Sequence, residues 1–399
     1  MNPFSTLYCR LFQTAFRCAI PFLPYREPIL LQNNGDLCSV LKENGVSSLL
    51  LVTDKNLFSL GLCNPLIVAV KEAGIALSVY SEVEPNPTTD NVEGAYEAYR
   101  SHHCQAILAF GGGSPIDCAK ALGIRVVHPK TPLSRFQGVL KVKKKIPLLI
   151  AVPTTAGTGS ETTLAAVIVD SVSRHKFAIN DFPLIPRYAL LDPSLLIGLP
   201  AWLTASTGLD AITHAVEAYI GRSTTKTTRA HAEKAILLAF SNLLTSFHEP
   251  QNLEARAKML EASYYAGMAF TVSYVGYVHA LSHALGGKYG VPHGLANAIL
   301  LPVVLRAYGK SAQKKLRRLA VITGLAQEDD EVGLAAEAFI SRLEAMNAEM
   351  GIPSFVEALQ EEDIPELART AAKEGNPLYP VPREMNAEEL SSIYRKVLK

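Results

Sequence analysis

The segment QAILAFGGGSPIDCAK, residues 105–120, joins a short apolar run to a glycine turn and then to a helical pattern. Residues 105–110 predict a buried strand, and residues 115–124 predict the helix that follows it. Two similar pairs precede this one: a strand at 47–54 with a helix at 65–73, and a strand at 75–82 with a helix at 91–100. The alternation predicts an α/β domain with a Rossmann-like parallel sheet and helices on both faces.

The turn contains Gly111, Gly112 and Gly113, which let the backbone approach a ligand without interference from a Cβ atom. Ser114 suits the N-cap of the following helix, and Pro115 suits its first position. The free N–H groups of such a helix start predict a site for the pyrophosphate of a dinucleotide. A glycine turn without a ligand would look similar, and the residues do not follow the GxGxxG pattern.

Two polar residues stand at the ends of the neighbouring strands. Asp54 ends the strand at 47–54, at the edge where dinucleotide folds place ligands. Its carboxylate can bind the ribose hydroxyls of NAD and repel the extra phosphate of NADP, although an ordinary strand-end aspartate would look the same. Asn86 stands in a rigid turn between two prolines after the next strand, and it is a candidate for a place beside the adenine.

A second strand followed by small hydroxyl residues occurs in IPLLIAVPTTAGTGSE, residues 146–161. Thr154, Thr155 and Thr158 supply hydroxyl donors between glycines. Because the carboxyl ends of parallel strands meet at one edge of a sheet, two such loops predict a ligand cleft at that edge. Lys176, further along, is a candidate contact to a phosphate or ribose, with an exposed lysine as the alternative.

From about residue 201 onward, the periodicity of the apolar residues is helical almost to the end of the chain. Short Gly and Pro interruptions separate the predicted helices, which suits an all-α helical bundle. Helices are predicted at 230–247, 253–270, 277–285, 294–305, 313–323 and 331–347. Asn386 and Glu389 predict the N-cap and the third position of a short terminal helix.

The helical half also contains one acid and four histidines in apolar surroundings. Asp210 and His214 are four residues apart, so they share one face of a helix. His279 and His283 are also four apart, and His293 follows. Burying such groups without partners costs roughly 2–7 kcal/mol each, and a bound divalent cation removes that cost. The spacing predicts a metal site and leaves open which of the five bind, since any one histidine could instead be satisfied by a backbone carbonyl.

Length and composition favour two compact domains. We expect an N-terminal extension at 1–25, a dinucleotide-binding α/β domain at 26–200 and an α-helical metal-binding domain at 201–399. Lys+Arg 38 against Asp+Glu 37 leaves a net charge of +1, so no nucleic-acid partner is indicated.

The cysteines and the apolar runs bear on the compartment. The six cysteines form no CxxC pair, which argues against a disulfide framework and agrees with a reducing cytoplasm. Because no run of about 18 apolar residues occurs, we expect no transmembrane segment. The stretch up to Tyr25 is apolar and aromatic and does not match a signal peptide. Packing on its own subunit is the favoured interpretation, with an amphipathic segment on a membrane or on a partner subunit as the alternative.

Four motifs occur in order along the chain: GGGSPIDCAK (111–120), PTTAGTGSE (153–161), GLDAITHAVEAYI (208–220) and VHALSHALGGKYGVPHGLANAILLP (278–302). With these motifs the chain resembles the iron-containing (group III) alcohol dehydrogenases over about residues 26–399. The resemblance implies a cytoplasmic, metal-dependent enzyme that transfers hydride between small primary alcohols and NAD, acting as a homodimer or larger homo-oligomer.

The same resemblance implies that Asp210, His214, His279 and His293 are the metal ligands, with Fe2+ as the expected ion and zinc as an alternative. His283 then stays off the metal, near the nicotinamide, where it could relay a proton. NAD is the implied cofactor and NADP is less favoured. The implied contacts to it are Asp54, Asn86, Gly112, Gly113, Ser114, Thr154, Thr155, Thr158, Lys176 and His283.

The chain departs from many relatives just before His279. Val272 stands where many have an asparagine, and Tyr274 and Tyr277 stand where many have smaller residues, so we expect these positions to line the substrate pocket. The alternative function on the same scaffold is an NAD- and metal-dependent lyase or synthase like dehydroquinate synthase. A phosphorylated substrate would need additional Lys or Arg, and residues 270–285 contain neither.

Overall fold

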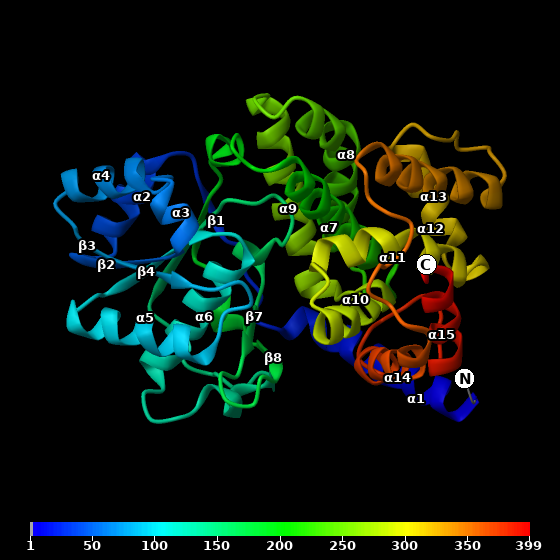
Figure 1. Cartoon of the computed structure of the whole chain (residues 1–399), viewed down its shortest axis with the longest axis horizontal. Helices are drawn as coiled ribbons and strands as arrows, with labels where there is room; N and C mark the ends of the chain where they lie inside the picture. The colour runs from blue at the N-terminus through cyan, green and yellow to red at the C-terminus, as the bar shows by residue number, and fades with distance from the viewer. Residues whose placement is uncertain (1–2) are drawn as a thin grey trace. The chain divides into compact units, whose positions relative to one another are not determined.

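A computed structural model of the chain describes residues 3–399 and consists of two compact units (Figure 1). One unit is Pro24–Ile197 and contains the strands. The other is Gly198–Lys399 together with residues 3–23, and it is helical. The N-terminal stretch therefore belongs to the helical unit.

Within the described residues, six parallel strands form one sheet in the order β1-β9-β6-β4-β2-β3. They are β1 (Ile29–Leu31), β2 (Ser48–Asp54), β3 (Ala76–Val83), β4 (Ala106–Gly111), β6 (Leu148–Pro153) and β9 (Tyr188–Leu190). This confirms the predicted Rossmann-like parallel sheet. The edge strand β1 was not predicted, because three residues are too few to show a periodicity.

The order of the strands creates a topological switch point. β2 pairs with β3 on one side and with β4 on the other, so the chain reverses direction across the sheet after β3. In open parallel sheets, ligands bind outside the carboxyl ends of the strands at such a point. Asp54 ends β2 and Gly111 ends β4, so both lie at this edge.

Helices cover both faces of the sheet. In Figure 1, α2, α3 and α4 lie on one side of it and α5 and α6 on the other. These helices are α2 (Asn34–Glu43), α3 (Lys55–Ser59), α4 (Asn64–Glu72), α5 (Thr89–Ser101) and α6 (Gly113–Val127). Leu50 and Val52 pack into the cluster with α5 and α6, whereas Leu49 and Leu51 pack into the cluster with α2 and α4. Burial on both faces explains the unbroken apolar runs of these strands.

A second, smaller sheet in the same unit carries Lys176. It consists of β5 (Gly138–Val139), β8 (Lys176–Asn180) and β7 (Ala165–Val169) in that order, with β7 and β8 antiparallel. Lys176 is the first residue of β8, and β7 ends beside the turn that contains Asn86, since Val169 N donates to the carbonyl of Pro87 (2.9 Å). This hairpin positions the lysine next to the main sheet.

The helical unit confirms the predicted bundle. Its helices are α7 (Ala201–Ile220), α8 (Lys226–His248), α9 (Leu253–Ser273), α10 (Tyr277–Tyr289), α11 (His293–Tyr308), α12 (Lys310–Ile322), α13 (Val332–Glu349), α14 (Ile364–Gly375) and α15 (Ala387–Lys396). The capping box of Asn386 and Glu389 at the start of α15 is confirmed. Helix α14 was not predicted. The central helix α7 packs against α8, α9 and α11, and α10 packs against α11 and α14.

The N-terminal stretch forms α1 (Pro3–Ala19), which packs on its own chain as expected. Arg10 donates to the carbonyls of Val381 (2.9 Å) and Pro382 (3.0 Å), and Gln13 donates to the carbonyl of Tyr379 (2.9 Å). Polar side chains thus hold α1 in place, while several of its apolar side chains are exposed, namely Phe4, Leu7, Tyr8 and Leu11.

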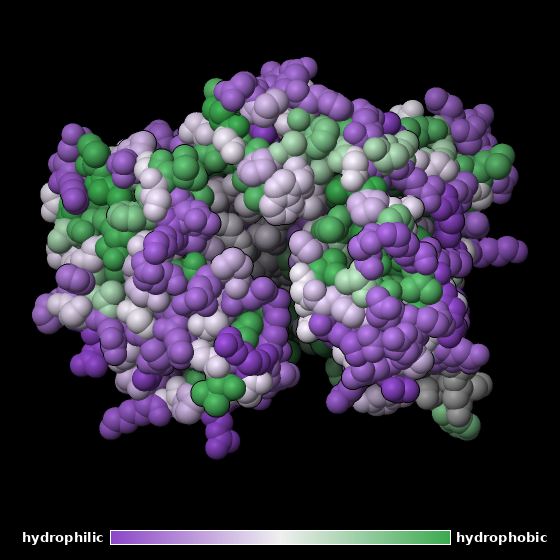
Figure 2. Space-filling model, viewed as in Figure 1, coloured by the Kyte–Doolittle hydropathy of each residue, from purple (hydrophilic) through white to green (hydrophobic). Residues whose placement is uncertain are grey.

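The surface is mainly hydrophilic in the view of Figure 2, with apolar residues gathered over α3 and α4. Exposed side chains there include Phe58, Leu60 and Val68. Across residues 3–399, no helix combines the length and the apolar character needed to span a bilayer. The six cysteines, all within that range, are free thiols.

Candidate metal centre and cofactor loops

Four of the five candidate metal ligands converge in the helical unit. Asp210, His214, His279 and His293 each offer one ligand atom, and these atoms all lie within 4.8 Å of one another. Asp210 and His214 lie one turn apart on α7, His279 is in the first turn of α10, and His293 begins α11. The first three are buried, so this is a set of carboxylate and imidazole donors inside the fold.

The amide of Asn297 marks the point on which three of the donors converge. Its Nδ2 donates to Asp210 Oδ1 (2.7 Å) and lies 3.1 Å from His293 Nε2 and 3.3 Å from His279 Nε2. Oxygen and imidazole nitrogen lone pairs that face one point are the donor set of a divalent cation such as Fe2+ or Zn2+. The residues present therefore fit a metal ion. Sequence reasoning missed Asn297, although it follows His293 by one helical turn.

His279 is oriented by a buried acid, Glu217, that sequence reasoning also missed. His279 Nδ1 lies 2.6 Å from Glu217 Oε2, which fixes the ring so that Nε2 faces the cluster. Glu217 also accepts the backbone N–H groups of Gly276 (2.7 Å) and Val278 (2.8 Å) at the start of α10. A carboxylate that holds the far nitrogen of a histidine sets its tautomer and strengthens it as a ligand. The spacing of Glu217 could have revealed it, since it lies on the same face of α7 as Asp210 and His214.

Burial shapes the charge of these groups. Burial and the neighbouring rings of His214 and His293 hold the pKa of His279 well below its ordinary value, so this imidazole is neutral near pH 7. A neutral imidazole is the form that binds a metal. Burial raises the pKa of Glu217 to about 7, against the three hydrogen bonds that lower it.

Gly294 allows α11 to approach α7 closely enough to bring His293 to Asp210. A Cβ atom at Gly294 would lie 2.4 Å from the backbone oxygen of Ser206 and 3.4 Å from Asp210 Cβ. A contact of 2.4 Å is impossible for a real side chain, so only glycine fits directly after His293. The result is a distance of 3.6 Å between His293 Nε2 and Asp210 Oδ1.

The fifth candidate, His283, lies beside the cluster but is not part of it. Its ring stacks on His293 with centroids 5.1 Å apart, and its side chain is 44% exposed. Its Nδ1 lies 2.6 Å from Glu374 Oε1, so the histidine has a carboxylate partner from α14. His283 lies one helical turn after the buried His279 on α10, at a point of the helix where its side chain is exposed.

The three residues expected to line the substrate pocket differ in burial. Tyr277 is fully buried, its hydroxyl donates to Asn376 Oδ1 (2.7 Å), and it accepts from Met385 N (2.9 Å). The prediction that Tyr277 lines the pocket is therefore wrong, because its polar group is used inside the core. Val272 and Tyr274 are half-buried at the end of α9. Tyr274 has a left-handed backbone (φ 61°) and contacts Phe16 of α1 edge-on, with centroids 5.2 Å apart.

In the other unit, the two glycine and threonine loops face each other closely. A Cβ atom on Gly112 would lie 3.3 Å from Thr155 Oγ1, and one on Gly113 would lie 3.3 Å from Thr158 Cγ2. Thr155 Oγ1 is buried and has no hydrogen-bond partner among residues 3–399. The loops thus combine helix-start N–H groups that no side chain caps with an unused hydroxyl, which fits an oxygen-rich ligand such as a pyrophosphate.

The predicted start of the helix after β4 is wrong by two residues. Gly112 is the N-cap of α6, without a side-chain capping bond, and Gly113 is its first residue. Ser114 and Pro115 therefore lie within the first turn, where a proline is tolerated because those N–H groups have no intrahelical partner. The glycine start leaves the N–H groups uncovered by any capping side chain.

The remaining predicted cofactor residues of this unit lie at or beside the same sheet edge. Asp54 Oδ1 accepts from Leu57 N (2.9 Å), so this carboxylate caps α3. Lys176 Nζ donates to Asn86 Oδ1 (2.7 Å), and Asn86 N donates to Ser114 Oγ (3.3 Å). The structure thus brings together three candidates from distant parts of the chain. Thr154 is buried, and its N–H donates to the carbonyl of Gly111 (3.1 Å).

A buried ionic cluster connects α6 to the loop after β6. Lys120 donates to Ser160 Oγ (3.1 Å) and Thr163 Oγ1 (2.8 Å), and Asp117 accepts from Ser160 Oγ (2.7 Å). Nearby, both carboxylate oxygens of Glu161 are buried without a hydrogen-bond partner in the described part of the chain. Burial lowers the pKa of Lys120 to about 8 and raises that of Glu161 to about 7.

The chain is similar to known proteins over nearly its whole length. The model of the iron-containing alcohol dehydrogenase family matches residues 31–193, and that of the C-terminal domain of the same family matches residues 204–398. A 1,3-propanediol dehydrogenase of Citrobacter freundii is 39% identical over 385 residues, which cover 96% of this chain and 98% of that protein. An NAD-dependent methanol dehydrogenase of Bacillus methanolicus is 36% identical, covering 83% of this chain and 87% of the relative.

A solved structure agrees with these sequence matches. The crystal structure of a 1,3-propanediol oxidoreductase superposes with a TM-score of 0.90 at 37% identity, covering 94% of this chain and all of that one. A metal-dependent dehydrogenase needs a site for the dinucleotide and a site for the metal. The parallel sheet of the dinucleotide-binding type and the cluster of acid and imidazole side chains match these two needs. The chain belongs to the iron-containing alcohol dehydrogenase family. It is an NAD-linked alcohol dehydrogenase and aldehyde reductase, and the lyase alternative finds no support in these matches.

Proposed function

We propose that the enzyme interconverts a small primary alcohol and its aldehyde, with a divalent iron held by Asp210, His214, His279 and His293. The convergence of these four donors within 4.8 Å is the observation that carries the proposal. The relatives named for 1,3-propanediol and methanol act on primary alcohols, which supports this substrate class. Zinc would also accept three imidazoles and a carboxylate, so the identity of the metal needs measurement.

Each residue of the cluster has a distinct part in this function. When bound, the cation supplies Lewis-acid polarisation of an alcohol or carbonyl oxygen. Asp210 contributes the negative charge of the ligand set, and Glu217 holds His279 so that its Nε2 lone pair stays directed at the cluster. His283, exposed at the edge of the cluster, accepts the hydroxyl proton of the alcohol and returns it when the aldehyde is reduced.

The cofactor unit binds NAD at the edge formed by β2, β4 and β6. NAD supplies the hydride acceptor, and the residues at this edge orient it. The N–H groups of Gly112, Gly113 and Ser114 bind the pyrophosphate, and the Thr155 hydroxyl, which is buried without a hydrogen-bond partner among the described residues, completes that site. Asp54 binds the ribose hydroxyls and repels the 2′-phosphate of NADP. The further contacts proposed within this unit are Asn86, Thr154, Thr158 and Lys176.

The experiment is a comparison of His279→Ala with His248→Ala. His248 lies at the end of α8, with a half-exposed side chain bonded to Glu349, and serves as the matched control. We expect His279→Ala to lose both bound metal, measured by elemental analysis of anaerobically purified protein, and NAD-linked turnover, measured by absorbance at 340 nm with a panel of primary alcohols. The control should keep both. Metal retained by His279→Ala at full activity would refute the ligand assignment.

The expected assembly and compartment remain predictions. We expect a homodimer or larger homo-oligomer in the cytoplasm, as the family resemblance implies. Light scattering coupled to gel filtration measures the mass in solution, and a mass equal to one chain of 43.2 kDa would contradict the first expectation.

A further inference from the structure

Three side chains form a hydrogen-bonded chain that leads from the edge of the histidine cluster to the C-terminal segment. His283 on α10 contacts Glu374 in the last turn of α14, with 2.6 Å between His283 Nδ1 and Glu374 Oε1. The hydroxyl of Tyr379, in the loop after α14, donates to the same oxygen at 2.6 Å. Nothing in the sequence predicted that these residues meet, since 91 positions separate the first two.

The geometry determines which nitrogen of His283 carries a proton. An ionised carboxylate only accepts hydrogen bonds, so His283 Nδ1–H donates to Glu374 and the lone pair of the neutral ring is on Nε2. Burial opposes ionisation of Glu374, but the His283 and Tyr379 partners outweigh it and lower the pKa of this carboxyl. Glu374 is therefore charged near pH 7 and fixes both the tautomer and the orientation of the imidazole.

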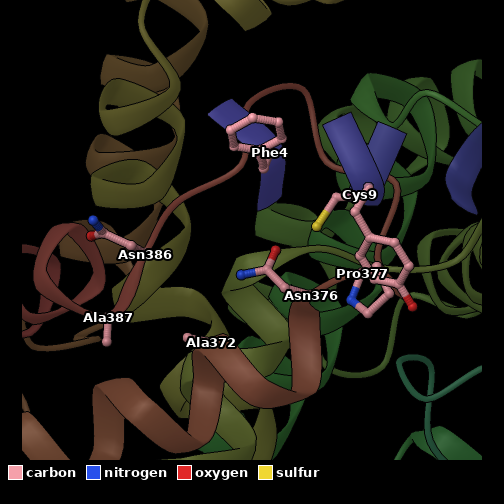
Figure 3. A pocket seen from close by; sticks show the side chains of 8 residues that line it. Phe4, Cys9, Ala372, Asn376, Pro377, Asn386 and Ala387 are labelled. Atoms are coloured by element: carbon pink, nitrogen blue, oxygen red, sulfur yellow. The ribbon is translucent and has the colours of Figure 1, made fainter. Parts of the chain in front are cut away.

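Tyr379 is itself held from the other side by the N-terminal helix. Its ring is buried, and its carbonyl accepts from the Gln13 side chain at 2.9 Å. Arg10 donates to two further carbonyls of the same segment, those of Val381 and Pro382. Figure 3 shows Cys9 and Phe4 of α1 beside Asn376 and Pro377, around an open pocket of about 570 Å³ whose lining residues include none of the histidine cluster.

We propose that Glu374 is a positioning residue for His283, and that Tyr379 and the N-terminal helix hold Glu374 in place. The proposal rests on the proposed function of His283 as the proton-transfer group. His283 is 44% exposed, so its ring needs a fixed partner to keep one orientation on the surface of the cluster. Glu374 supplies that partner at Nδ1 of the ring. The N-terminal helix thus supports the active site without contributing a ligand.

The test is a double-mutant cycle with Glu374→Leu and His283→Ala. We expect Glu374→Leu to lower kcat about tenfold, with KM for NAD and the metal content unchanged. This loss is smaller than the rate enhancement of about 10²–10⁴-fold that a positioned acid–base group contributes, because His283 itself is still present. Glu374→Gln keeps an oxygen acceptor and should recover most of the loss. Glu366→Leu is the matched control, because Glu366 lies on α14 with a 66% exposed side chain and should have no effect.

The cycle separates this proposal from the function on which it depends. If Glu374 acts through His283, Glu374→Leu lowers kcat no further in the His283→Ala background. An equal tenfold loss in that background would overturn the positioning role, as would wild-type kcat in Glu374→Leu when His283→Ala is impaired. Wild-type kcat in His283→Ala would instead refute the proposed role of His283. Tyr379→Phe and Gln13→Ala should lower kcat in the same direction by less, and neither should add to Glu374→Leu.

Discussion

Glu217 and His279 meet at 2.6 Å between a carboxylate oxygen and Nδ1, and both side chains are almost fully buried. The acid comes from α7 and the histidine from α10, so this contact joins the two helices that carry three of the four proposed ligands. Because Glu217 also accepts two backbone N–H groups at the start of α10, one carboxylate fixes the helix and the ring together.

Glu217→Gln should weaken metal binding about 10–100-fold, the usual effect of removing the carboxylate partner of a ligating histidine. The neutral amide is a poorer acceptor than the carboxylate. Its NH₂ group would also face an N–H donor, because both carboxylate oxygens of Glu217 accept hydrogen bonds in the wild type. Competition with a chelator measures the dissociation constant, and circular dichroism verifies the fold. Glu254→Gln, at an exposed position in the first turn of α9, is the control. An unchanged dissociation constant in Glu217→Gln would show that the orientation of His279 does not depend on this acid.

Gly294→Ala should destabilise the helical unit by about 1–3 kcal/mol, the range for forcing a methyl group into a packed site. The new Cβ would meet the backbone oxygen of Ser206 at 2.4 Å, so α11 must move away from α7 and carry His293 with it. We expect a lower Tm together with a lower metal content. Gly287→Ala, on α10 with nothing within 4 Å of the new Cβ, should not destabilise the protein. Equal Tm values for the two variants would contradict the close approach of these helices.

Asp54→Asn should raise kcat/KM with NADP relative to NAD. Asparagine keeps the cap on Leu57 N, since Asn and Asp are about equally good N-caps, so the variant removes charge without removing the structural role. The measurement is steady-state kinetics with both cofactors. Asp192→Asn is the control, because Asp192 is another capping aspartate of the same unit. A cofactor preference that does not change in Asp54→Asn would remove this residue from the cofactor site.

Glu161→Gln should change how stability depends on pH. The folded-state pKa of Glu161 is raised to about 7 from 4.5, so the protonated form stabilises the fold at low pH. That contribution is fully present below pH 4.5 and is lost as the pH rises through 7. The free energy of unfolding of Glu161→Gln, relative to wild type, should therefore be higher at pH 8 than at pH 5, by up to roughly 3 kcal/mol. Denaturant unfolding at the two pH values measures it, and a difference that does not vary with pH would contradict a buried carboxylate that lacks a hydrogen-bond partner among residues 3–399.

The sequence alone determined the class of fold and the identity of most site residues. Apolar runs such as 47–54 and 105–110 are buried on both faces, so their strands could be recognised from composition alone. Asp210 with His214, and His279 with His283, showed their shared helical faces through a spacing of four. Local periodicity depends only on residues that are close in the sequence, so it can be recognised without coordinates.

Only the tertiary structure decided which distant residues meet. Asn297, Glu217 and Glu374 complete the surroundings of the histidines, and each does so through a contact between different helices. The start of α6 at Gly113 and the burial of Tyr277 also depended on neighbours that no local pattern specifies. Hydrogen bonds across 62 and 91 positions arise from helix packing, and packing is set by the shapes of all the contacting surfaces rather than by the spacing within one segment.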